Sequence, residues 1–184
     1  MPYAVTHILF PIILLALFRD YYIKKRDRKN FPLHYVLLAG IGGALPDIDI
    51  PISFALNIFG VESWQIHKTF THSLLFPGIF VLGFVLLNRA SPSARICNIT
   101  RHKLKLSLIS LMLGIGALTH ILLDSLFFFF FYFYYPFSNK AFGTNLLAFL
   151  QPELQDGALK LLDGILLLAW IVYLELKHRI SDFI

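Results

Sequence analysis

Charged residues are scarce in this sequence. Only 15% of its 184 residues are Asp, Glu, Lys or Arg, whereas a soluble domain usually carries about 25%. Hydrophobic residues make up 57% of the chain, and the mean hydropathy is +0.69. These values exclude an ordinary soluble domain and favour an integral membrane protein, with room for roughly five spans at about 20 residues each.

Cysteine is almost absent as well. The single Cys97 excludes an internal disulfide and any metal motif built on several cysteines. The first apolar stretch has no basic residues ahead of it, so we expect no cleavable signal peptide. The length and the composition together predict one membrane-embedded helical domain over residues 1–184.

What the sequence does contain is a series of long apolar segments. They predict an all-α, polytopic membrane helix bundle of about five spans. The expected spans are residues 4–18, 34–60, 70–87, 104–135 and 158–176. We expect the second span to be broken between Gly42 and Asp49, because paired glycines and Pro46 disfavour a continuous helix there.

The basic residues predict an orientation. Of the 16 Lys and Arg residues, 13 lie in three segments, with six at 19–29, five at 89–105 and two at 177–179. The positive-inside rule makes all three segments cytoplasmic. We therefore expect a multi-pass protein of the cell inner membrane, with the amino terminus outside and the carboxyl terminus in the cytoplasm. The positive charges serve as orientation signals and as contacts for anionic lipids, so no nucleic-acid partner is expected.

Ionisable side chains interrupt the apolar segments, where they are costly and usually functional. Counting about 1.5 Å per residue from the cytoplasmic end of each span places five of them roughly 17 to 24 Å up, in the outer half of the membrane. These five are His7, Asp47, His72, His120 and Asp163, with Asp124 one turn above His120. A shared layer predicts one common site.

The residue types in this layer favour a metal site. His120 and Asp124 are four residues apart and share a helix face. Two adjacent carboxylates, Asp47 and Asp49, need cations in a low dielectric. Histidine and aspartate are ligands that zinc accepts. The predicted metal ligands are His7, Asp47, Asp49, His67, His72, His120 and Asp124.

Structural roles are the alternative for each of these groups. His120 and Asp124 could form a hydrogen-bonded pair, Asp47 and Asp49 a helix cap, and His67 and His72 an interfacial polar pair. Asp163 is either a carboxylate that supports the site or an ordinary residue at the outer end of a helix. The sequence alone does not decide between these structural roles and metal binding.

Four sequence blocks together carry a resemblance. They are Gly43-Ala44-Leu45-Pro46-Asp47-Ile48-Asp49, His67-Lys68-Thr69-Phe70-Thr71-His72-Ser73, His120-Ile121-Leu122-Leu123-Asp124 and Tyr135-Pro136-Phe137-Ser138, preceded by Thr6-His7. In this order they resemble a bacterial and archaeal family of membrane-bound metal-dependent hydrolases. Some members of that family are described as SOS-repressor-binding inner-membrane hydrolases. Family members often have arginine where this chain has Lys68, which keeps the charge but loses the bidentate fork.

The resemblance implies an activity. The family is similar in motif to the zinc-dependent phospholipase C and single-strand nuclease superfamily, whose His-x-x-x-Asp helix His120 and Asp124 match. It implies a hydrolase that holds two or three zinc ions and cleaves a phosphoester, such as a phospholipid head group. Asp47 or Asp49 would take the proton from the attacking water. Lys68, Ser73 and Ser138 are the expected substrate-binding residues.

Two other functions share the same residues. A divalent-cation transporter would also need intramembrane carboxylates and imidazoles, together with polar groups that lead to the cytoplasmic side. A non-catalytic scaffold would use the metal only to tie helices together, and its site would have no open coordination position.

Overall fold

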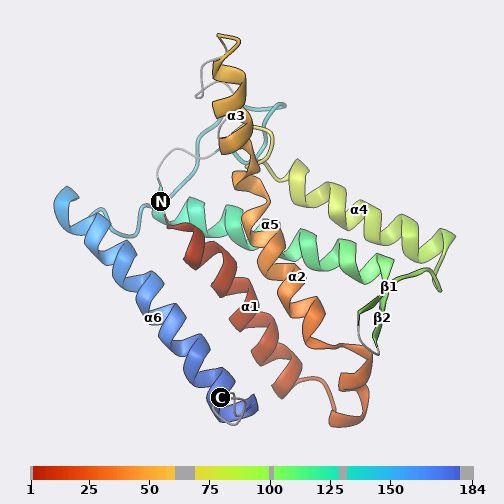
Figure 1. The fold of residues 1–184 in the computed structure, drawn as a ribbon. Coiled ribbons are helices and arrows are strands. Elements are labelled where there is room, and N and C mark those ends of the chain that lie inside the picture. The colour runs from red at the N-terminus through yellow and green to blue at the C-terminus, as the bar shows by residue number, and fades with distance from the viewer. Residues whose placement is uncertain (1, 61–68, 100–101, 129–131, 179–184) are drawn as a thin grey trace.

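The computed structural model describes residues 2–60, 69–99, 102–128 and 132–178 (Figure 1). The described chain is predominantly helical, as the sequence predicted. Its elements are α1 (Ala4–Tyr21), η1 (Lys25–Asn30), α2 (Leu33–Ala44), η2 (Pro46–Ile48), α3 (Asp49–Asn57), α4 (Leu75–Ala90), β1 (Arg95–Ile99), β2 (His102–Lys105), α5 (Leu106–Phe127) and α6 (Pro152–His178).

The number of spans differs from the prediction. Three described helices, α1, α5 and α6, are long and apolar enough to cross a membrane. A fourth span exists if α2 and the segment Pro46–Asn57, which are bent by 47° at their junction, count as one. The described helices therefore provide three or four candidate spans by length and composition, fewer than the expected five. The apolar segment at 70–87 contains turns before α4 begins at Leu75, and the 16 residues of α4 rise only about 24 Å against a hydrocarbon core of about 30 Å.

The other span boundaries confirm one expectation and correct another. The break expected between Gly42 and Asp49 is present, because α2 ends at Ala44 and Pro46 starts the short 3₁₀ helix η2. The helix expected to run on to residue 135 instead ends at Phe127, where Phe128 is extended. Bulky aromatic residues are weak helix formers, and Pro136 disfavours helical backbone at Tyr135.

The antiparallel strands β1 and β2 are an element that hydropathy did not predict. Arg95 pairs with Lys105, and the pair joins the end of α4 to the start of α5. The pairing lies in one of the basic segments and leaves the helical class unchanged.

Helices α2 and α5 form the centre of the bundle, with α1 packed on α2, α4 on α5 and α6 mainly on α1 (Figure 1). Glycines permit the close central contacts. A Cβ atom at Gly116 would lie 2.0 Å from the carbonyl oxygen of Ala39, and one at Gly42 would lie 2.4 Å from that of Leu113. Small residues at helix contacts are typical of membrane bundles, where helix association depends on close packing.

The outer surface is apolar rather than charged. Helix α6 exposes Leu161, Ile165 and Leu168. The core between the helices is built from residues such as Tyr35, Val36 and Ala39. An apolar exterior around a packed interior is what lipid surroundings require. The bundle therefore combines an apolar outer surface, which suits lipid, with a packed apolar core.

Candidate metal centre

Four segments of the bundle bring their polar residues to one place. Its members, which we call the donor cluster, are His7 from the first turns of α1, Asp47 from η2, His72 from the turn before α4, and His120 and Asp124 from α5. His7, His72, His120 and Asp124 are at most 1% exposed, while the side chain of Asp47 is 27% exposed. The cluster is thus buried, with one carboxylate at its edge.

His7, His120 and Asp124 form one half of the donor cluster. Nε2 of His7 lies 3.3 Å from Oδ1 of Asp124, and Nε2 of His120 lies 3.5 Å from Oδ2 of the same residue. The two imidazole rings are stacked, with their centroids 3.7 Å apart. Each oxygen of Asp124 therefore faces a different imidazole.

Asp47, His72 and His120 form the other half. Oδ1 of Asp47 lies 3.5 Å from Nε2 of His72 and 3.6 Å from Nε2 of His120. The separation between Nε2 of His72 and Oδ2 of Asp124 is 3.8 Å. His120 belongs to both halves, so the five residues make one continuous group of potential metal ligands.

These separations have a chemical meaning. They exceed the usual 2.7–3.2 Å of a nitrogen–oxygen hydrogen bond, and Nε2 of His120 and both oxygens of Asp124 make no hydrogen bond within the described residues. Ligands at 2.0–2.1 Å from a tetrahedral zinc ion lie about 3.3–3.4 Å from one another. The donor atoms are therefore too far apart to form normal hydrogen bonds with one another. Their separations are close to the distances between ligand atoms around one zinc ion.

The second ring nitrogen of His120 fixes how the ring is turned. Nδ1 lies 2.7 Å from the carbonyl oxygen of Gly43, and because a carbonyl only accepts, Nδ1 carries the proton and donates it. The lone pair of a neutral ring is then on Nε2, which faces the carboxylates. This contact depends on a glycine, since a Cβ atom at Gly43 would lie 2.1 Å from the carbonyl oxygen of His7.

Asp49 and Thr71 hold His72 in a similar way. The Thr71 hydroxyl donates to Oδ2 of Asp49 at 2.7 Å, and its oxygen lies 3.0 Å from Nδ1 of His72. Since that hydroxyl proton is already donated, its oxygen accepts from the imidazole. The Nε2 atom of His72 is again left to face Asp47 and Asp124.

This arrangement gives Asp49 a different place from the one expected of an ion-bridging ligand. Its carboxylate is buried and lies 3.3 Å from Nδ1 of His72, on the side of the ring that faces away from the other donors. The carboxylate whose two oxygens face different imidazoles is Asp124. Asp49 is thus placed to orient His72, and its role as a ligand or a base stays a prediction.

The comparisons with known proteins place the chain in a family. The profile of the family described as YdjM inner membrane protein matches residues 1–178. The chain belongs to the YdjM inner membrane protein family. No curated protein and no solved structure matches the chain.

Membership of the YdjM family supports part of what the sequence predicted. It agrees with the membrane helices and with the inner-membrane location. The family description gives a cellular location and no reaction. The resemblance to hydrolases and to zinc phospholipases therefore depends on the sequence motifs alone. The chemistry must be argued from the donor cluster.

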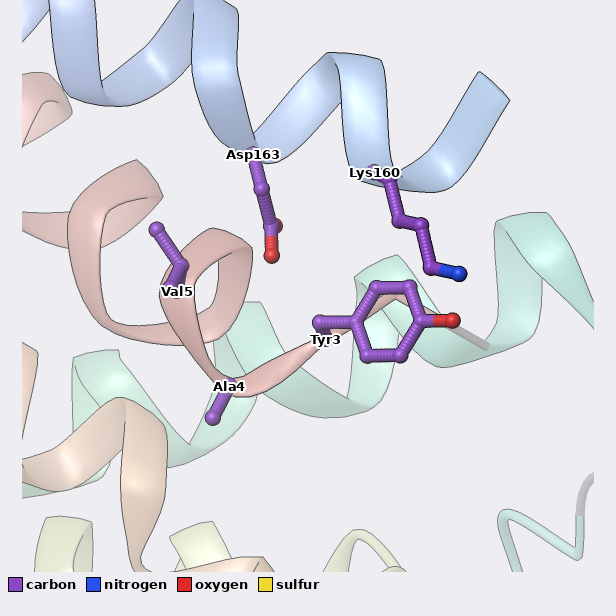
Figure 2. A pocket seen from close by; sticks show the side chains of 5 residues that line it. All are labelled: Tyr3, Ala4, Val5, Lys160 and Asp163. Carbon is purple, nitrogen blue, oxygen red and sulfur yellow. The ribbon is translucent and has the colours of Figure 1, made fainter. Parts of the chain in front are cut away.

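Asp163, whose role the sequence left open, hydrogen-bonds Thr6 and no histidine among the residues that the structure describes. Oδ1 accepts from the backbone nitrogen of Thr6 at 2.9 Å and from the Thr6 hydroxyl at 2.5 Å. Figure 2 shows the carboxylate reaching from α6 toward the first turn of α1. Asp163 therefore lies beside the site, one residue removed from His7.

A threonine directly precedes three of the buried histidines, as Thr6-His7, Thr71-His72 and Thr119-His120, and the three threonines have different partners. Thr6 contacts Asp163, Thr71 contacts Asp49, and Thr119 donates to the carbonyl oxygen of Gly116 at 2.7 Å. The sequence left open whether these threonines orient the imidazoles or bond backbone carbonyls, and it did not identify the Gly43 carbonyl as a support. The threonine before each histidine was the available signal for Thr71, whereas nothing in the sequence marks a backbone carbonyl.

Two of the three expected substrate-binding residues, Ser73 and Ser138, lie within the described chain. The buried hydroxyl of Ser73 donates to the carbonyl oxygen of Phe70 at 2.8 Å. This hydrogen bond lies within the turn that precedes α4. Ser138 accepts from the backbone nitrogen of Lys140, and its hydrogen bonds in the described chain reach no His or Asp. His67 and Lys68 lie outside the described residues.

Proposed function

We propose that this protein is an integral-membrane, metal-dependent hydrolase that cleaves a phosphoester, with a lipid head group as the substrate. The observation that carries the proposal is the arrangement of Asp124, whose buried oxygens face His7 on one side and His72 and His120 on the other. A carboxylate so placed has the disposition of one that bridges two metal ions. Three imidazoles and two carboxylates form a ligand set suited to zinc.

The assignment of ligands follows the contacts. His7 would share one ion with Oδ1 of Asp124. Asp47, His72 and His120 would share another with Oδ2 of Asp124. A third ion would need ligands beyond these five, for which His67 is the candidate from the sequence.

Bound zinc would supply a water activated at neutral pH and positive charge against the phosphoryl oxygens. The chain's own part is to hold the Nε2 atoms of His72 and His120 toward the carboxylates through Thr71 and the Gly43 carbonyl, and to leave one edge open. That edge is Asp47, the least buried member of the donor cluster. Asp47 is therefore the residue best placed to accept a proton from a water that enters the site.

The proposed site lies in the outer half of the membrane. The basic segments follow α1 and α4 and precede α2 and α5, whereas the donor cluster lies at the other ends of these helices. By the positive-inside rule the donor cluster then faces outward and the amino terminus lies outside. A cytoplasmic carboxyl terminus further requires the short helix α4 to return the chain to the cytoplasmic side, because four spans alone would leave both termini on one side. A site at this depth reaches the head group of a lipid that stays in its leaflet.

A divalent-cation transporter is the main rival. A carrier needs polar groups that lead from the site to the cytoplasmic side. In the described part of the chain, the interior below the donor cluster is packed with residues such as Ile12, Ala39 and Met112. The described interior therefore favours an enzyme over a carrier, and the exposed edge at Asp47 favours an enzyme over a closed scaffold.

The test combines metal content with activity. The protein is purified in detergent, its metals are measured by elemental analysis, and the release of phosphate or head group from mixed lipids is assayed. His120→Ala and Asp124→Asn should lose both metal and activity, while His34→Asn, at the opposite end of α2, should keep both. A folded wild-type protein without metal would overturn the proposal. Metal without hydrolysis would favour the scaffold, and metal flux into liposomes without hydrolysis would favour the transporter.

A further inference from the structure

Helix α6 supplies no member of the donor cluster, yet it is bonded to the helix that carries His7. Three hydrogen-bonded contacts in the described chain join α6 to α1 and the residue before it: Tyr3 to Asp156, Thr6 to Asp163, and Asp20 to Tyr173, the last at 2.8 Å. Lys177 of α6 also lies over the ring of Tyr21, 5.6 Å from its centroid. The other packing of α6 is sparse, since its apolar side chains are largely exposed. Of the three contacts, only that of Thr6 with Asp163 adjoins a member of the donor cluster.

The start of α1 has no cap of its own. The residue at the cap position, Tyr3, is extended, and its side chain makes no capping hydrogen bond. Asp163 takes that place from 157 positions away in the sequence, because its carboxylate accepts both the backbone N–H and the hydroxyl of Thr6. Thr6 is the third residue of the helix, where an N-cap side chain normally bonds, and a negative charge there complements the helix dipole.

Packing holds only the inner side of this turn, where Thr6 and His7 are buried. A cleft of about 410 Å³ lies beside it, lined by Tyr3, Ala4, Val5, Lys160 and Asp163. Figure 2 shows this space between the start of α1 and α6, with the Asp163 carboxylate at its inner side. Because this side of the turn adjoins open space, the hydrogen bonds to Asp163 help to restrain its position there.

His7, the next residue, depends on this turn more than the other imidazoles do on theirs. Nδ1 of His120 bonds to Gly43, and Nδ1 of His72 contacts Thr71. Nδ1 of His7 has no hydrogen-bond partner within the described residues. Its ring is therefore oriented by its backbone and by stacking on His120.

We infer that Asp163 is a positioning residue of the metal centre, acting through Thr6 to hold Nε2 of His7 against Asp124. This inference rests on the proposed metal site and extends it to α6. Groups that hydrogen-bond a metal ligand commonly change metal affinity 10- to 100-fold. Asp163 acts through the residue next to the ligand, so we expect the lower end of that range.

Cobalt(II) binding tests the inference, because the visible spectrum of cobalt reports the ligands directly. Asp163→Ala should bind cobalt about 10-fold more weakly or worse and should show an altered spectrum. Asp163→Asn keeps an acceptor oxygen at the same place, so affinity and spectrum should return toward those of the wild type. Tyr173→Phe is the matched control, since it removes another α6–α1 bond at the far end of α1 and should leave cobalt binding unchanged.

A second measurement keeps the two proposals apart. Hydrogen exchange at the Thr6 amide, measured in metal-free protein, should speed up in Asp163→Ala and not in Tyr173→Phe. Unchanged exchange in Asp163→Ala, or wild-type cobalt affinity and spectrum in that variant, would overturn the role of Asp163. A wild-type protein that takes up no cobalt, with the exchange result as expected, would instead overturn the metal centre.

Discussion

Nδ1 of His120 donates a 2.7 Å hydrogen bond to the carbonyl oxygen of Gly43. The bond joins α5 to the end of α2, at the position where the second apolar segment breaks. It turns Nε2 of His120 toward Asp47 and Asp124. The break in the helix, the glycine and the imidazole therefore act as one unit, which can be tested by changing any of the three.

Gly43→Ala should disrupt this unit. The added Cβ would lie 2.1 Å from the carbonyl oxygen of His7, so α1 and α2 must separate, at a cost of about 1–3 kcal/mol. Thermal unfolding and metal content should both fall. Gly78→Ala is the matched control, because a Cβ there meets nothing within 4 Å. Equal stability and metal content in the two variants would contradict the packing argument.

Thr71→Val should weaken metal binding without unfolding the protein. The substitution keeps the side-chain shape but removes the hydroxyl that links Asp49 to His72, and loss of such a support typically costs 10- to 100-fold in affinity. Thr119→Val serves as the comparison, since its hydroxyl bonds only the backbone of α5. A zinc titration that gives the same affinity for both variants would rule out the orienting role of Thr71.

His7→Ala and Asp124→Asn should differ in the number of ions lost. If Asp124 bridges two ions, replacing it should remove both, whereas replacing His7 should remove only the ion on Oδ1. Elemental analysis should give two zinc ions per wild-type chain, one in His7→Ala and none in Asp124→Asn. A single ion in the wild type would refute the bridging assignment.

The orientation can be read by labelling single cysteines in intact cells. In a Cys97→Ala background, Asn139→Cys should react with a membrane-impermeant maleimide, because it lies in the segment that follows α5 at the proposed outer face. Lys25→Cys, in a basic segment, should react only after the cells are opened. The opposite pattern would place the donor cluster on the cytoplasmic side.

The sequence predicted the helical class and the break in the second segment because both depend on local chemistry. Apolar length specifies a membrane helix, and Pro46 after paired glycines interrupts one. It overestimated the spans, since hydropathy does not distinguish the turns at 70–74 from the helix that begins at Leu75. Hydropathy does not predict the strands β1 and β2, because the basic residues of this segment indicate its side of the membrane and not its backbone conformation.

Depth counting grouped the donor-cluster residues by height but not by lateral position. The structure brings His7, Asp47, His72, His120 and Asp124 within reach of one another. It places Asp49 on the side of His72 that faces away from the other donors, and it places Asp163 in hydrogen-bond contact with Thr6. Which way a residue faces around the helix axis depends on how the helices pack, and in this bundle that packing is set by close glycine contacts such as that of Gly116 with Ala39. No periodicity in a nearly uniform apolar segment encodes those contacts.

The most direct test of the central claim is head-group release from mixed lipids by metal-depleted protein, measured as zinc is added back. The account predicts that hydrolysis rises with bound zinc and is absent at every zinc level in folded Asp124→Asn. A folded wild-type protein that binds zinc through these residues yet releases no phosphate or head group at any loading would contradict it.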